Sequence, residues 1–68
     1  ENKELKEQIK TALDKLTIEK RLVVVMYEME GKSLEEIAEI IEKPLGTVKS
    51  RLFHARKELE KILRKYLH

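Results

Sequence analysis

The chain has 68 residues, which is enough for one small domain that buries only about 60% of its unfolded surface. It contains no cysteine, which excludes disulfide bonds and thiolate metal sites, and no apolar run approaches the roughly 20 residues of a membrane span. Two glycines and one proline, among many Glu, Lys, Leu and Ile residues, predict an all-α fold. We expect a cytoplasmic protein that does not associate with membranes.

The formal net charge of +2 hides an uneven distribution along the chain. Residues 1–43 hold eight Lys/Arg and eleven Asp/Glu, whereas residues 44–68 hold seven Lys/Arg and two Glu. A basic C-terminal segment on a mildly acidic body favours a polyanionic partner that approaches from one side, although a solvated cationic tail would show the same asymmetry.

Two amphipathic helices are predicted in the first half of the chain. The first covers residues 3–15 and carries one apolar face: Leu5, Ile9, Ala12, Leu13 and Leu16. Thr17 is placed to cap the second, over residues 18–30. That helix is apolar almost all round: Ile18, Leu22, Val23, Val24, Val25, Met26, Tyr27 and Met29. It is interpreted either as the central helix of the bundle or as a helix that also docks another protein.

A helix-turn-helix motif is predicted over residues 33–56. Gly31 is placed for a left-handed cap at the end of the second helix. Ser33 and Glu36 have the spacing of a capping box that starts a third helix. A buried face follows in that helix: Leu34, Ile37, Ala38 and Ile41. Pro44 then has the fixed φ of a first-turn residue, and a long helix runs nearly to the end of the chain, through Tyr66.

The long last helix divides into two faces at a period of 3.6 residues. One face is apolar: Leu45, Val48, Leu52, Ala55, Leu59 and Ile62. The other combines a glycine, two cations, a hydroxyl and two rings: Gly46, Lys49, Ser50, Phe53, His54 and Lys57. This second set suits the floor of a DNA groove better than a core, and we interpret the helix as a recognition helix.

Specific motifs then suggest a family. Ser-Leu-Glu-Glu-Ile-Ala-Glu-Ile over residues 33–40 is followed by Pro-Leu-Gly-Thr-Val-Lys-Ser-Arg-Leu over residues 44–52 and by Ala55-Arg56. Residues from roughly 5 to 65 resemble region 4, the C-terminal domain of bacterial RNA polymerase sigma factors, especially the extracytoplasmic-function (ECF) group. The resemblance implies one four-helix domain over residues 1–68, of the winged-helix-like DNA-binding superfamily.

The resemblance also implies partners and residue roles. The partners would be the upstream (−35) promoter element as double-stranded DNA, the flap of the polymerase β subunit and a possible anti-sigma factor, with no cofactor. Gly46 and Thr47 would approach phosphates at the helix N-terminus, where N–H groups point outward. Lys49, Ser50 and His54 would face base edges.

Other positions border this predicted surface or depart from the family pattern. Phe53 would lie against sugars or a thymine methyl, and Arg51 would contact a phosphate or form an intramolecular ion pair. Arg56 borders the apolar stripe, where a packed stem with a structural hydrogen bond is also consistent. The family usually has Pro where this chain has Thr17, which exchanges one helix-start residue for another. Many members have a permanently charged Arg at the position of His54. Because an imidazole can gain or lose a proton near neutral pH, we expect DNA binding by this chain to depend on pH.

Two other functions are consistent with parts of this sequence pattern. LuxR-type response-regulator domains have a similar four-helix plan and a Thr-Val-Lys, but usually place His where this chain has Arg51. The domain could instead act chiefly as a protein-interaction module through its second helix. No enzyme is expected, because Asp14 is the only aspartate and His54 has only Glu58 one turn away.

Overall fold

The structure is a computed structural model that describes residues 2–65, and within that range it contains four α-helices and no strand. The helices are α1 (Asn2–Asp14), α2 (Ile18–Val24), α3 (Leu34–Ile41) and α4 (Leu45–Arg64), with a π-helical segment, η1 (Val25–Met29), continuing α2. The predicted all-α, four-helix fold is therefore confirmed. None of the described helices combines the length and the apolarity that a membrane crossing requires.

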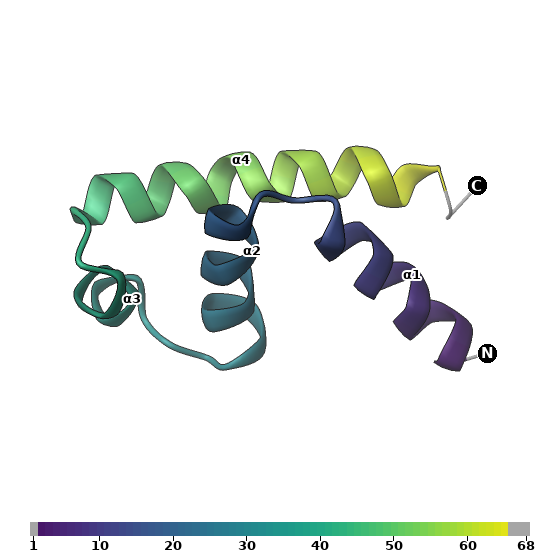
Figure 1. The fold of residues 1–68 in the computed structure, drawn as a ribbon, viewed down its shortest axis with the longest axis horizontal. Coiled ribbons are helices and arrows are strands. Elements are labelled where there is room, and N and C mark those ends of the chain that lie inside the picture. Colours follow the sequence, from purple (N-terminus) through teal and green to yellow (C-terminus); the bar gives the residue numbers. More distant parts are fainter. Residues whose placement is uncertain (1, 66–68) are drawn as a thin grey trace.

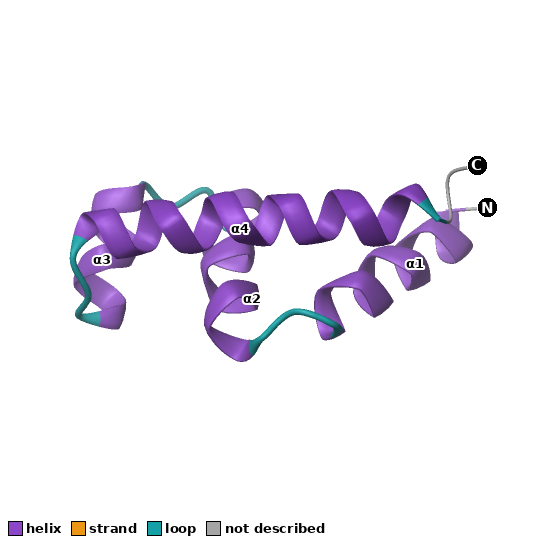
Figure 2. Ribbon diagram, turned by 90° about the horizontal axis from the view of Figure 1, so that it is seen from above, coloured by secondary structure: helices purple, strands orange, loops and turns teal. Residues whose placement is uncertain are grey.

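Helix α4 runs along the length of the domain, and the other helices lie along it in the order α3, α2, α1 (Figure 1). The same order appears when the molecule is turned by 90°, with α3 beside the start of α4 and α1 beside its second half (Figure 2). The domain measures 37 × 19 × 15 Å along its principal axes, so it is elongated along α4. This arrangement makes α4 the element on which all other helices pack.

The core forms where α2 and α3 meet the first half of α4. Its buried side chains come from every helix: Ala12, Leu16, Val23, Val24, Met26, Ile37, Val48, Leu52 and Ala55. Val23, Ile37 and Val48 have no exposed surface and come from α2, α3 and α4, so a single cluster joins three helices. Each such side chain contributes about 1.5–3 kcal/mol by leaving water.

The second helix starts as predicted and ends differently. Thr17 caps it, because the Thr17 hydroxyl accepts a hydrogen bond from the backbone N–H of Lys20 at 3.3 Å. Its last turn widens into η1, in which the N–H of Glu30 donates to the carbonyl of Val25, five residues back, at 3.0 Å. Gly31 then takes a positive φ of 72°, which confirms the predicted left-handed residue after the helix.

Helix α2 and η1 divide into a buried and an exposed side. Val23, Val24 and Met26 face the core, whereas Ile18 and Met29 are 72% and 58% exposed. The second helix is therefore central to the core and also leaves an apolar stripe open to solvent.

The turn between α3 and α4 is held by its caps. Ser33 and Glu36 form the predicted capping box: the Ser33 N–H donates to the Glu36 carboxylate at 2.8 Å, and the Glu36 N–H donates to the Ser33 hydroxyl at 3.0 Å. Hydrogen bonds from the Ser33 backbone and then from its side chain lower the pKa of Glu36. Ile37 is fully buried, and Leu34, Ala38 and Ile41 pack partly buried against the core, as predicted.

The entry to α4 differs from the prediction in one detail. Pro44 has φ −60° and ψ 150°, so it lies just before the first helical turn as the cap residue, with Leu45 as the first helical residue. Its φ is the one expected, but its extended ψ is needed to redirect the chain from α3. Helix α4 ends at Arg64, and the predicted continuation to Tyr66 lies outside the described residues.

Glu42 ends α3 in the left-handed conformation, with φ 57° and ψ 49°. Its Cβ makes this conformation costly by roughly 1–2 kcal/mol, whereas glycine adopts it freely. We expect Glu42→Gly to raise the free energy of unfolding by about 0.5–1 kcal/mol in urea denaturation, after allowing for the greater freedom of glycine in the unfolded chain.

The matched control is Glu42→Ala, which removes the carboxylate but keeps the Cβ. It should give no gain in stability. An equal gain from Ala and Gly would show that the charge, rather than the backbone conformation, limits stability at this turn.

Candidate nucleic-acid interface

The predicted DNA-binding residues all lie in the first three and a half turns of α4. Val48, Leu52 and Ala55 are buried on the opposite side of that helix. Most of the predicted residues are exposed: Gly46, Lys49, Ser50, Phe53, His54 and Lys57. Thr47 and Arg51 are half-buried, so they lie on the flank of the helix, between the exposed and the buried face. The structure thus brings six of the eight residues together on one open surface.

The first turn of α4 differs from the expected phosphate-binding geometry in one respect. The N–H of Thr47 already donates to the carbonyl of Pro44 at 3.0 Å, and the N–H of Val48 donates to the same oxygen at 3.2 Å. The Thr47 hydroxyl, rather than its N–H, is therefore the group available to a phosphate. A Cβ added at Gly46 would meet no atom within 4 Å, so glycine there is not required by packing inside the domain.

Four side chains of α4 form a connected group at the centre of the exposed face, and we call it the ring cluster: Ser50, Phe53, His54 and Lys57. The rings of Phe53 and His54 meet edge to face, with centroids 5.4 Å apart and an interplanar angle of 83°. The Lys57 ammonium lies 5.4 Å from the centre of the Phe53 ring. His54 Nδ1 lies 2.9 Å from the Ser50 carbonyl oxygen. Phe53 remains 57% exposed, although a ring of this kind is usually buried.

Arg56 belongs to the structure of the domain rather than to the exposed face. Its Nε donates to the Glu28 carboxylate at 2.9 Å, its Nη2 reaches the same oxygen, and its guanidinium lies 5.5 Å from the centre of the Tyr27 ring. The hydrogen bond with Glu28 raises the pKa of Arg56 above its ordinary value. Arg56 therefore ties α4 to η1, in agreement with a packed stem and a structural hydrogen bond.

A second ion pair joins a flank of α4 to α2. The Lys20 ammonium contacts the Glu58 carboxylate one turn past His54. Lys61 and Arg64 extend the cationic surface further along α4 and line a shallow hollow that also includes His54 and Lys57. Lys61 and Arg64 follow Lys57 at spacings of four and three residues, which keep them on the same side of a helix. The sequence pattern could therefore have included them, but the predicted DNA-binding residues ended at Lys57. Within residues 2–65 no three His, Asp or Glu side chains gather in a way that could hold a metal ion.

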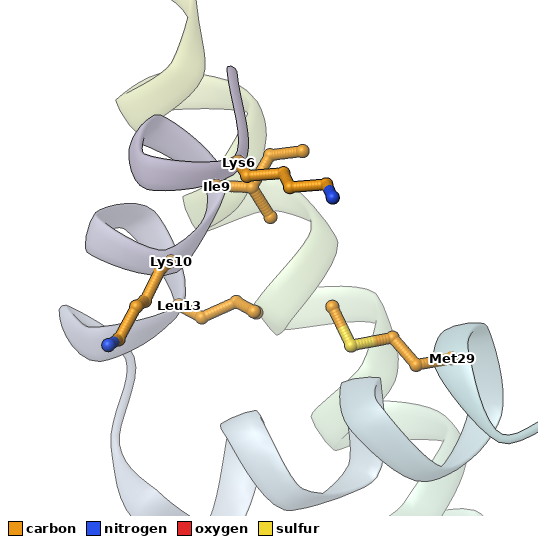
Figure 3. Close-up of a pocket in the computed structure, with 5 residues that line it drawn as sticks. All are labelled: Lys6, Ile9, Lys10, Leu13 and Met29. Carbon is orange, nitrogen blue, oxygen red and sulfur yellow. The ribbon is translucent and has the colours of Figure 1, made fainter. Parts of the chain in front are cut away.

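A separate apolar groove lies between α1 and η1, on another part of the surface. Its lining consists of Lys6, Ile9, Lys10, Leu13 and Met29. Leu13 and Met29 point toward one another from the two helices, and Lys10 is turned away from Met29 (Figure 3). The groove shares no residue with the exposed face of α4, so the domain has two distinct surfaces.

The fold and this surface define a helix-turn-helix domain whose last helix carries an exposed cationic face. The chain belongs to the family "Sigma-70, region 4", which it matches over residues 6–59. It is 36% identical over 59 residues to the "ECF RNA polymerase sigma-E factor" of Escherichia coli K12 and, equally, to that of Salmonella typhimurium LT2. Both alignments cover 87% of this chain and 31% of the relative.

A third relative, the "RNA polymerase sigma-H factor" of Pseudomonas aeruginosa PAO1, is 34% identical over 64 residues, which cover 94% of this chain and 33% of the relative. The chain thus spans about a third of the length of the curated relatives it matches. Between the two helix-turn-helix families considered from the sequence, the family match favours sigma region 4 over the LuxR type.

If Arg56 is structural, replacing it should change stability but not the choice of DNA sequence. The partners in the Arg56–Glu28 pair are 55% and 43% exposed, so we expect Arg56→Gln to cost no more than about 1 kcal/mol in urea denaturation. Glu28→Gln removes the same pair from the other side and should cost a similar amount. Loss of sequence-selective duplex binding in Arg56→Gln alone, with stability unchanged, would show instead that Arg56 contacts DNA.

Proposed function

We propose that this domain recognises the upstream (−35) promoter element for a bacterial sigma factor of the ECF group, with α4 in the major groove, and so directs RNA polymerase to its promoters. The role is one of binding and not of catalysis, and it is exerted in the cytoplasm, where the DNA and the polymerase are. The observation that carries the proposal is the exposed face of α4, which holds cations, a hydroxyl and two rings. It lies opposite an apolar stripe whose central residues, Val48, Leu52 and Ala55, are buried.

The proposed contacts follow from where each side chain lies. Lys49 and Ser50 are exposed near the N-terminal end of α4, the part of a recognition helix that meets base edges. Phe53 is exposed in the ring cluster, where its ring can contact sugars or a thymine methyl. The half-buried Thr47 and Arg51 lie on one flank, where a hydroxyl and a guanidinium would contact the phosphates that border the groove.

Phosphate contacts supply much of the affinity of such a surface, and they make it dependent on salt. If about 4–6 phosphates are neutralised, log K should fall with log salt at a slope of roughly −4 to −5. A domain this small binds weakly on its own, so its attachment to polymerase would raise its effective concentration at the promoter.

A second role is favoured by the groove between α1 and η1. We propose that it docks the flap of the polymerase β subunit, because its floor is apolar and Met29 is 58% exposed. The groove shares no residue with the exposed face of α4, so the β flap and DNA could bind at the same time. An anti-sigma factor that covers the groove would compete with polymerase without touching α4.

Lys49→Ala should reduce discrimination between a promoter duplex and a scrambled one, because a good base contact is worth about 1–3 kcal/mol. Lys61→Ala is the matched control: it removes the same charge from the same helix, further along, and should cause only a small loss for both duplexes. Fluorescence anisotropy over a range of salt concentrations would measure both effects. Equal loss of discrimination in the two variants would mean that the exposed face is assigned wrongly.

Met29→Glu should weaken binding of an isolated β-flap fragment at least several-fold, since it places a charge in the apolar groove, and should leave duplex binding unchanged. Ile18→Glu is the control, because Ile18 is an equally apolar and more exposed side chain outside the groove. If Ile18→Glu is the variant that loses flap binding, the docking surface is the exposed side of α2 instead.

A further inference from the structure

The hydrogen bond within the ring cluster determines what His54 can offer to a ligand. Its Nδ1 lies 2.9 Å from the Ser50 backbone carbonyl oxygen and 3.4 Å from the Ser50 hydroxyl. A carbonyl oxygen only accepts hydrogen bonds, and two lone pairs facing one another at 2.9 Å would repel. Nδ1 must therefore carry a proton in this geometry, and it donates that proton to the carbonyl one turn back on the same helix.

This contact leaves the second ring nitrogen free. No described residue forms a hydrogen bond with Nε2, which lies across the ring from Nδ1 and hence away from the Ser50 carbonyl. The edge-to-face contact with Phe53 holds the plane of the ring as well. Because the single proton of a neutral imidazole is already on Nδ1, Nε2 of neutral His54 is an acceptor only. Protonation turns the same atom into a donor.

The major groove presents donors and acceptors that differ between bases. The amino groups of cytosine and adenine donate, whereas O6 and N7 of guanine, N7 of adenine and O4 of thymine accept. Cytosine therefore offers only a donor, and guanine and thymine offer only acceptors. We propose that His54 is a specificity-determining residue whose base preference reverses with pH: neutral His54 selects the amino group of cytosine or adenine, and protonated His54 selects a base that offers only acceptors, guanine or thymine. This inference rests on the proposed function, because it requires α4 to lie in the groove.

The imidazole of His54 is surrounded by charged side chains of α4 and α2. On α4, Arg51 precedes His54 by one turn, and the hollow beside it is lined by charged side chains of the same helix: Lys57, Glu58, Glu60, Lys61 and Arg64. Glu60 is paired with Arg64, and α2 contributes Lys20, which is paired with Glu58. Glu28 of η1 is engaged with Arg56 on the opposite flank of α4. No ion pair joins α1 or α3 to α4 within the described residues. Because the His54 side chain is exposed, a base edge can approach its second ring nitrogen.

The first test reads the tautomer directly. In the 68-residue chain labelled with ¹⁵N on histidine, the imidazole nitrogen shifts at about pH 8 should identify His54 Nδ1 as protonated and Nε2 as unprotonated. This is the less populated tautomer of free histidine in water, so its observation would require the Ser50 contact. A protonated Nε2 at that pH would overturn the proposal.

The second test reads base preference without a known promoter. The chain selects duplexes from a pool with a randomised segment, at about pH 6 and about pH 8 and at fixed salt, and the bound sequences are counted. At one base pair, the preference should move from cytosine or adenine at the higher pH to guanine or thymine at the lower pH, by about three- to tenfold. His54→Arg, a permanent donor, should prefer guanine there at both pH values.

The outcomes separate this proposal from the proposed function. A defined selected sequence with the same preference at both pH values would contradict the role of His54 and leave promoter recognition intact. A shift that persists in His54→Gln, which does not titrate, would also contradict it. If no sequence is selected at either pH, promoter recognition itself fails, and the inference about His54 fails with it.

Discussion

The burial of one stripe of α4 is the constraint on which the rest of the structure depends. Val48 and Ala55 have no exposed surface, and they meet Val23 of α2 and Ile37 of α3 in a single cluster. An α-helix has one direction opposite any buried stripe, so this packing fixes which side chains remain in solvent. The exposed face of α4 owes its orientation to core packing rather than to interactions among its own charges.

The ion pairs between helices contribute less to the fold than this core packing does. The Lys20–Glu58 and Glu28–Arg56 pairs connect α4 to α2 and to η1 at partly exposed positions, where such pairs contribute little to stability. Both occupy flanks of α4. Lys49 and Lys57 form no such ion pair with any described residue and lie on the exposed face of α4. This distribution explains how a chain of small net charge can present a basic surface.

The sequence was sufficient for the parts of the fold that depend on local pattern. Apolar spacing predicted all four helices, and the Thr17 cap, the Ser33–Glu36 capping box and the left-handed Gly31 follow from residue type and position. The π-helical turn of η1 and the left-handed Glu42 could not be predicted, because tertiary packing imposes them on residues that do not favour them. The Glu28–Arg56 pair was hidden because its partners are 28 positions apart.

The sequence predicted which residues belong to the candidate site, but it did not predict their hydrogen bonds or side-chain orientations. Spacing alone places Ser50, Phe53 and His54 on one side of a helix. The three-dimensional structure adds that the Nδ1 atom of His54 faces the Ser50 carbonyl and that the Thr47 N–H already donates to the Pro44 carbonyl. Such details depend on rotamers and on backbone direction at the helix start, which residue types do not specify.

The most direct measurement of the central claim is backbone amide NMR of the chain during titration with a duplex that it selects. If the exposed face of α4 enters the groove, the largest shift changes should fall within residues 46–57, while the apolar groove between α1 and η1 stays unchanged. Largest changes at Ile9, Leu13 and Met29, with α4 unaffected, would contradict the account.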